Sequence, residues 1–176
     1  RKAPDIDQTT QTLTRLMRAQ AAQGSFKAAS DAAEAWLRKK PADGTVRSTL
    51  AELQIRAGDL PGARRQYETL LKGRPTDGTA LNNLANVLIE LKDPGAIEVA
   101  ERALKVDPRN AVYLDTAGWA NHRAGKAERA LQLLRDARLR APENADIRYH
   151  LAVVLAQAGR KAEAREELNA ALRSGA

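Results

Sequence analysis

Prolines recur along this chain at a nearly constant interval, and this interval constrains the fold more than any other feature of the sequence. The separations are 34, 33 and 34 residues between Pro41, Pro75, Pro108 and Pro142. Glycines repeat the interval, with separations of 34, 67 and 34 residues between Gly24, Gly58, Gly125 and Gly159. The long separation spans two periods, one of which has lost a residue, and we place the loss near the turn at residues 92–95. A fixed period of this length is typical of a protein built from stacked supersecondary units.

Each period contains two amphipathic segments separated by a turn. In the second period the first apolar stripe is Val46, Leu50, Leu53 and Ala57, and the second is Ala63, Tyr67, Leu70 and Leu71. Spacings of three and four residues put each stripe on one face of a helix. Gly58 ends the first helix because glycine enters the left-handed conformation without steric cost. Pro75 follows the second helix because proline lacks an N–H and disfavours helix in the residue before it.

Small residues recur where two antiparallel helices would approach most closely. The second segments carry Ala29, Ala63, Ala96, Ala130 and Ala164, and the first segments carry Ala51, Ala85, Gly118 and Ala152. Hydrophobic residues make up 43% of the chain but aromatic residues only 3%, so the core must consist of Ala, Leu, Val and Ile. Each period is therefore predicted to form a helical hairpin.

These positions resemble the tetratricopeptide repeat pattern, which is Trp-x-x-Leu-Gly-x-x-Tyr, then Ala-x-x-x-Phe, then Pro. The Leu position holds Leu16, Leu50, Leu84, Ala117 and Leu151, whereas the Trp position departs from the pattern with Leu13, Arg47, Leu81, Leu114 and Arg148. In the first repeat Ala33 stands where Phe is usual and Trp36 where Ala is usual, which we interpret as an exchange of volume within one hairpin. The resemblance implies an all-α, α-α superhelix (a tetratricopeptide solenoid) of about five helix-turn-helix repeats and ten helices. The expected boundaries are a linker or N-terminal cap over 1–9 and a repeat domain over 10–176, with repeats at about 10–43, 44–77, 78–110, 111–144 and 145–176.

Three short runs look similar to a narrower group, the bacterial exopolysaccharide and exosortase-linked (PEP-CTERM system) lipoproteins. The runs cover residues 81–85, 114–119 and 146–152. This resemblance implies a periplasmic or envelope-associated protein, with the cytoplasm left open as the alternative. Because the chain starts at Arg1 and lacks an initiator Met, we expect it to be a fragment or a processed form.

The tetratricopeptide resemblance also implies a concave groove lined by the first helix of each repeat. The residues expected to line it are Arg15, Arg18, Thr49, Glu52, Arg56, Asn82, Asn83, Asn86, Glu90, Asp115, Trp119, His122, Arg123, Tyr149 and His150. Asn side chains can bond the backbone of an extended peptide, and Trp and Arg are typical interface anchors. The alternative is that the Asn side chains are only solvated and that Trp119 packs between repeats.

The sequence offers little that could support catalysis. It has no Cys, no phosphate-binding glycine loop and no nucleophile elbow, so we expect neither an enzyme nor a cofactor. His122 and His150 could face each other on neighbouring first helices, but two histidines make a poor zinc site. The groove positions at which related chaperone-binding domains grip a carboxylate hold Thr116, Asp146 and His150 instead, so we do not predict that clamp.

Two functions remain as hypotheses. The first is a protein–protein scaffold that binds a partner segment in its groove. The second is electrostatic binding of an anionic polymer, nucleic acid or polysaccharide, because the chain carries a net charge of +7. Its Lys and Arg residues are dispersed and aromatic residues are scarce, which disfavours specific nucleic-acid binding. No transmembrane segment is expected, and self-association through the uncapped last repeat stays open as a further interaction.

Overall fold

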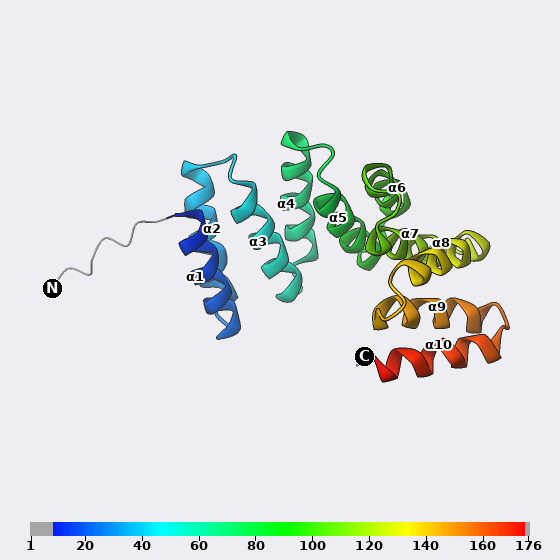
Figure 1. The fold of residues 1–176 in the computed structure, drawn as a ribbon. Coiled ribbons are helices and arrows are strands. Elements are labelled where there is room, and N and C mark those ends of the chain that lie inside the picture. The colour runs from blue at the N-terminus through cyan, green and yellow to red at the C-terminus, as the bar shows by residue number, and fades with distance from the viewer. Residues whose placement is uncertain (1–8, 175–176) are drawn as a thin grey trace. The chain divides into compact units, whose positions relative to one another are not determined.

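The computed structural model describes residues 9–174, which form ten α-helices and no strand (Figure 1). The bounds are α1 (Thr10–Ala22), α2 (Phe26–Lys39), α3 (Gly44–Arg56), α4 (Leu60–Gly73), α5 (Gly78–Glu90), α6 (Ala96–Val106), α7 (Ala111–Arg123), α8 (Ala127–Arg140), α9 (Ala145–Gln157) and α10 (Lys161–Arg173). The predicted all-α fold and its number of helices are confirmed. The prediction of a linker or cap over 1–9 falls, apart from Thr9, outside the described residues. None of the described helices is long and apolar enough to cross a bilayer.

The chain divides into two compact units where the sequence predicts one repeat domain. The first unit extends to Pro75 and contains α1–α4, and the second starts at Thr76 and contains α5–α10. Within the first unit α3 packs on α1 and α2. Within the second unit α7 packs on α5 and α6, and α9 packs on α7 and α8. Each hairpin in a unit thus buries its apolar face on the hairpin before it, which is how a repeat protein builds a continuous core.

Left-handed residues end the first helix of every hairpin. Glycine supplies this conformation at Gly24, Gly58, Gly125 and Gly159, with φ between 76 and 80°. In the third hairpin Lys92 takes the place of glycine with a φ of 55°, at a cost of about 1–2 kcal/mol because its Cβ approaches the following carbonyl. The next helix, α6, starts only at Ala96 and has 11 residues. The prediction of a shortened turn at residues 92–95 is wrong, since residues 91–95 separate α5 from α6 whereas three residues separate the two helices in every other described hairpin. The third period is shorter because α6 itself is short.

Asp43 joins three helices of the first unit. Its Oδ1 accepts the amide of Val46 as the N-cap of α3, and its Oδ2 accepts the Thr10 hydroxyl at 2.6 Å and Nε1–H of Trp36 at 2.8 Å. Burial alone would raise the pKa of this carboxyl, but the hydrogen bonds from Thr10, Trp36 and the backbone amides outweigh burial and lower the pKa. Trp36 and Ala33 are both buried in one apolar cluster, as the proposed exchange of volume requires.

Gly118 shows why the hairpins need small residues. A Cβ built on Gly118 of α7 would lie 2.7 Å from Cγ of Leu134 on α8. Leu134 is fully buried between these helices and the next hairpin, so it has little room to move. The close approach of α7 and α8 therefore depends on the missing side chain.

Candidate functional site

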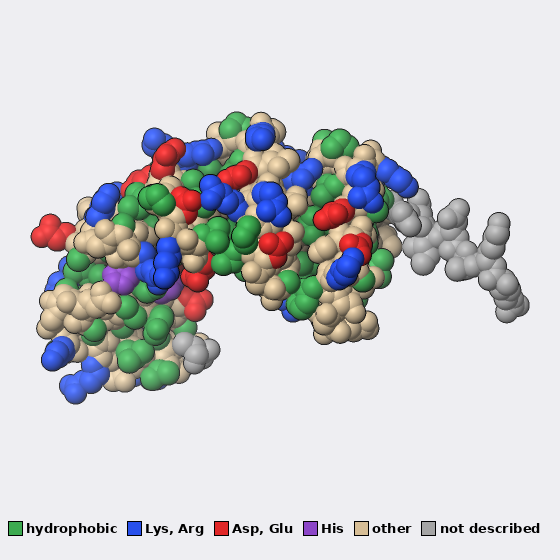
Figure 2. Space-filling view, turned by 180° about the vertical axis from the view of Figure 1, so that it is seen from behind, with side chains coloured by type: hydrophobic (Ala, Val, Ile, Leu, Met, Phe, Trp, Pro, Cys, Tyr) green, Lys and Arg blue, Asp and Glu red, His purple; other side chains and the backbone are tan. Residues whose placement is uncertain are grey.

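Aromatic and imidazole rings meet where α7 and α9 of the second unit lie side by side. The ring of Trp119 on α7 stacks on His150 of α9 with centroids 4.4 Å apart and an interplanar angle of 17°. His122, one turn after Trp119, tilts against the same indole at 4.8 Å. Tyr149 lies 6.0 Å from His150 and is 49% exposed. In Figure 2 both histidines (purple) are visible together on one face.

Asp115 orients His150. The Nδ1 atom of His150 lies 3.0 Å from both carboxylate oxygens of Asp115, which sits one turn before Trp119 on α7. Because an ionised carboxylate only accepts, Nδ1 carries the proton and donates it. Nε2 of His150 is then left to interact with a ligand or with water. The pair also fixes the imidazole plane against which Trp119 stacks.

His122 lies in a less favourable setting for a positive charge. Burial is the largest cause that lowers its pKa, followed by the positive charges of Arg123 and His150. The imidazole is therefore held in its neutral form down to a lower pH than a free histidine. Its neighbour Trp119 packs against a buried apolar cluster of residues from α8, α9 and α10. The indole is therefore supported by the hydrophobic core.

Asparagines on α5 extend the same face of the second unit. Asn86 is exposed, and its amide lies 3.4 Å from the Thr116 hydroxyl of α7. Asn83 is half-buried, with the Asn82 amide 3.5 Å from its side-chain oxygen, and Glu90 is exposed one turn beyond Asn86. The first helices of the second unit therefore carry side-chain amides on α5 and rings on α7 and α9.

The four charged residues predicted for the first unit lie on α1 and α3 and are all exposed. A nitrogen of Arg18 on α1 lies 4.0 Å from a carboxylate oxygen of Glu52 on α3, and the guanidinium of Arg56 lies 6.0 Å from the Phe26 ring centroid. Arg15 is exposed on α1. An ion pair this open to solvent contributes little to stability. These side chains form a charged surface on the first unit.

Three residues expected in the groove are buried. Thr49, Asn82 and Asp115 are only 2, 5 and 8% exposed. They face the contacts between helices, because the first helix of a repeat packs against neighbouring helices and only a narrow face of it is exposed to solvent. Two pairings, Asp115 with His150 and Asn86 with Thr116, were not predicted from the sequence. Their separations of 35 and 30 residues, close to one repeat, are the signal that would have found them.

Among residues 9–174, no group of three or more His, Asp or Glu side chains is placed to hold a metal ion. The arrangement on α5, α7 and α9 is instead one of rings, amides and one buried carboxylate. Such groups stack on and hydrogen-bond a bound segment.

A family model described as tetratricopeptide repeat matches residues 20–88 and 122–176, which is more than half of the chain. The chain belongs to the tetratricopeptide repeat family. No curated protein matches it. Among solved structures it is similar to MamA from Desulfovibrio magneticus RS-1, with 19% identity, a TM-score of 0.78 and 94% of each chain covered.

Two further tetratricopeptide proteins have similar folds. TTC0263 from Thermus thermophilus is 24% identical with a TM-score of 0.78, covering 95% of this chain and 92% of that one. YrrB, described as having an unusual peptide-binding site, is 18% identical with a TM-score of 0.69, covering 93% of this chain and 84% of that one. At these identities the similarity concerns the fold. The fold is consistent with a protein-interaction scaffold.

Proposed function

We propose that this chain is a non-enzymatic scaffold and that its second unit binds a partner segment on the face of α5, α7 and α9. The observation that carries the proposal is the stack of Trp119 on His150, braced by Asp115 and continued by exposed Tyr149. Only 3% of the residues in this chain are aromatic, so the rings on α7 and α9 make this face different from an ordinary polar helix face. Rings that are already fixed in the free protein lose little conformational entropy when a partner binds to them.

The partner that fits this face is an extended or helical peptide with an apolar or aromatic side chain. That side chain would pack beside Tyr149 and the exposed part of Trp119. Asn86 would bond a backbone amide of the peptide, since its side chain offers both donors and an acceptor. His150 would add a bond from Nε2.

Selection from a random peptide library displayed on phage tests this proposal. Peptides enriched on the wild-type chain should lose binding to a Trp119→Ala, Asn86→Ala double variant, and should keep binding to a Leu139→Ala control. Leu139 is 69% exposed on α8, away from the first helices. Enriched peptides that bind the double variant as well as they bind wild type would sink the proposal.

We also propose a role on the envelope side of a bacterial cell, in a polysaccharide-export or protein-sorting system. The support is the likeness of residues 81–85, 114–119 and 146–152 to the lipoproteins of such systems. Fractionation of the native cells, followed by an antibody raised against this chain, tests the compartment. Recovery in the cytosolic fraction alone would contradict it.

A further inference from the structure

An arginine fills the same position between hairpins in two parts of the chain. Arg47, the fourth residue of α3, donates to the Pro41 carbonyl and to the Gln66 side chain of α4, both at 2.9 Å. Arg148, the fourth residue of α9, donates to the Pro142 carbonyl and, at 2.6 Å, to Glu167 of α10. In each case the guanidinium joins the segment that precedes its own hairpin to the second helix of that hairpin.

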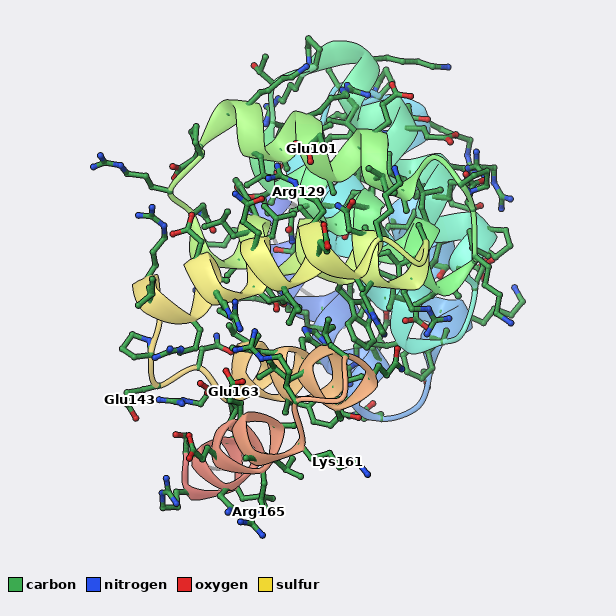
Figure 3. The ribbon with its side chains drawn as sticks, turned by 90° about the vertical axis from the view of Figure 1, so that its right-hand side faces the viewer. Glu101, Arg129, Glu143, Lys161, Glu163 and Arg165 are labelled. Carbon is green, nitrogen blue, oxygen red and sulfur yellow. The ribbon has the colours of Figure 1, made fainter. Side chains whose placement is uncertain are left out.

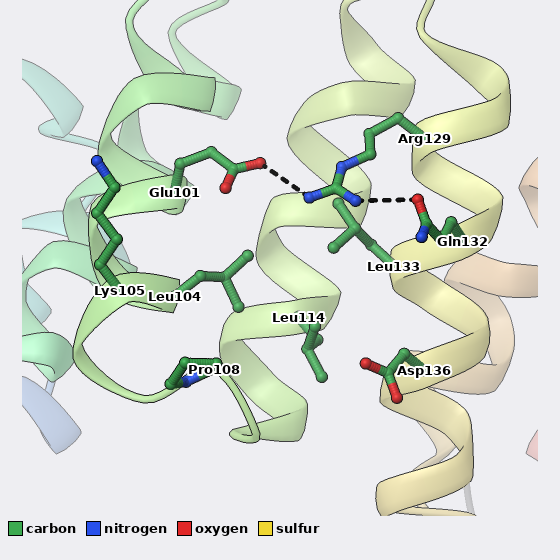
Figure 4. Close-up of a pocket in the computed structure, with 9 residues that line it drawn as sticks. All are labelled: Glu101, Leu104, Lys105, Pro108, Leu114, Arg129, Gln132, Leu133 and Asp136. Atoms are coloured by element: carbon green, nitrogen blue, oxygen red, sulfur yellow. Dashed lines mark hydrogen bonds and ion pairs between the residues drawn. The ribbon is translucent and has the colours of Figure 1, made fainter.

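The corresponding place between α6 and α8 has no arginine. Leu114 is the fourth residue of α7, and Leu133 of α8 stands where Gln66 and Glu167 stand in the hairpins of Arg47 and Arg148. Leu114 has no donor for the carbonyl of Pro108, which is the counterpart of Pro41 and Pro142. A pocket of about 360 Å³ opens there, with Leu104, Leu114 and Leu133 at its base (Figure 4).

Charged side chains from both second helices surround this pocket. Glu101 of α6 and Arg129 of α8 point toward one another (Figure 3) and lie 3.5 Å apart. Asp136 of α8 also lines the pocket, and its carboxylate pairs with Arg140 at 3.2 Å. This i,i+4 pair is partly exposed, so exchanging Arg140 for another cation costs little.

We propose that the pocket between α6 and α8 binds an arginine side chain of a partner protein. The stem of that arginine lies on Leu104, Leu114 and Leu133, and its guanidinium donates to the Pro108 carbonyl and to Asp136. The ligand repeats the contact that Arg47 and Arg148 make with the proline carbonyl. Asp136, one turn after Leu133, would replace the acceptors Gln66 and Glu167. A guanidinium suits this place better than an ammonium because it is planar, weakly hydrated and donates to two acceptors at once.

The site lies between the second helices α6 and α8, with Leu114 of α7 at its base, and uses none of the residues proposed to bind a peptide on α5, α7 and α9. The two proposals can therefore fail independently. The competing chemistry is an acidic ligand, since Lys105 and Arg129 line the same pocket, although Arg129 already pairs with Glu101. A carboxylate would have to approach Glu101 and Asp136, and it would leave the Pro108 carbonyl without a donor. The test therefore compares the two charges on the same apolar stem.

The experiment is a titration of the 176-residue chain, followed by NMR of the leucine methyl groups, with n-butylguanidinium and with pentanoate. We expect saturable shifts of the methyls of Leu104, Leu114 and Leu133 with n-butylguanidinium and much weaker shifts with pentanoate. Equal or stronger shifts with pentanoate, or no saturable shift at these methyls with n-butylguanidinium, would overturn the proposal.

Two variants and one control variant locate the binding. A Leu114→Arg, Leu133→Glu double variant copies the arrangement of Arg148 and Glu167, fills the pocket with the chain's own arginine, and should abolish the titration. Asp136→Asn should weaken it by about tenfold, since a charged hydrogen-bond partner is lost. Asp146→Asn removes the same charge from an exposed site on α9 and should leave it unchanged. If the double variant does not fold, the comparison of Asp136→Asn with Asp146→Asn decides. Equal binding of n-butylguanidinium by these two variants would contradict the site.

Discussion

Replacing Asp43 by Ala tests whether one carboxylate holds α1, α2 and α3 together. The substitution removes the N-cap of α3, which costs about 1 kcal/mol. It also leaves Nε1–H of Trp36, a side chain only 7% exposed, without its acceptor at 2.8 Å, at a cost of about 1–3 kcal/mol. The Thr10 hydroxyl is half-buried and can turn to water, so it adds little. The expected loss in free energy of unfolding is about 2–4 kcal/mol for the first unit.

Urea denaturation followed by far-UV circular dichroism measures this loss. A double-mutant cycle with Trp36→Phe isolates the bond from the indole, because Phe keeps the ring in place and removes the donor. The coupling between the two sites should be about 1–2 kcal/mol. A coupling below about 0.3 kcal/mol, within the usual error of additivity, would refute the reasoning that the indole depends on Asp43.

The same carboxylate gives a pH dependence of known sign. Its pKa is lowered in the folded chain, so the unfolded chain binds more protons at acidic pH. The stabilisation is complete above the unfolded value of about 3.9 and is lost as the pH falls through the folded pKa. Asp43→Asn, which cannot titrate, should flatten this part of the profile of unfolding free energy against pH.

Three further predictions concern single positions. Gly118→Ala should lower the free energy of unfolding of the second unit by about 1–3 kcal/mol, because its Cβ would clash with Leu134. Gly73→Ala is the control, because a Cβ there meets nothing within 4 Å and should cause no such loss. Equal stabilities of the two variants in urea denaturation would contradict the close approach. Lys92→Gly should raise the melting temperature by relieving a left-handed residue, a gain of about 0.5–1 kcal/mol in unfolding free energy, and a fall would contradict it. Because the pKa of His122 is lowered in the fold, stability should decline as the pH falls below about 6.5 toward the folded pKa, and His122→Gln should reduce that decline.

The electrostatic alternative makes a different prediction. Binding of an anionic polymer by dispersed Lys and Arg residues should weaken steeply with ionic strength, because it depends on counterion release. Binding of a peptide on the face of α5, α7 and α9 should change only modestly with salt. Isothermal titration at low and moderate ionic strength, with heparin and with a selected peptide, distinguishes the two.

The hairpins could be predicted from the sequence because their determinants are local and repeat. A glycine such as Gly58 ends a helix through its own backbone conformation. Alanines such as Ala63 and Ala130 indicate where the two helices of one hairpin approach closely. The residue missing from the third period was also visible in the sequence, although it is lost from α6 and not from the turn. These signals depend only on neighbours along the chain, and each signal recurs in several repeats.

The site could be predicted only in part. The sequence placed Trp119 and His150 on one expected surface, but it also placed Asp115 and Asn82 there, and both are buried. Whether a polar residue faces solvent or a neighbouring helix depends on how far each hairpin rotates against the one before it. That rotation is set by the side chains packed between hairpins, and no spacing in the sequence encodes it.

The sequence by itself determined the helices, their ends and their pairing into hairpins, since these follow from turn residues and from apolar spacing within about 34 residues. Only the tertiary structure decided which side chains meet across hairpins. It brought Asp115 to His150 and left a pocket at Leu114, whereas Arg47 and Arg148 hold the equivalent position in two other hairpins. It also divided the contacts into two units. The physical reason is distance along the chain: a contact across one repeat depends on the volume and direction of every side chain packed between the two helices.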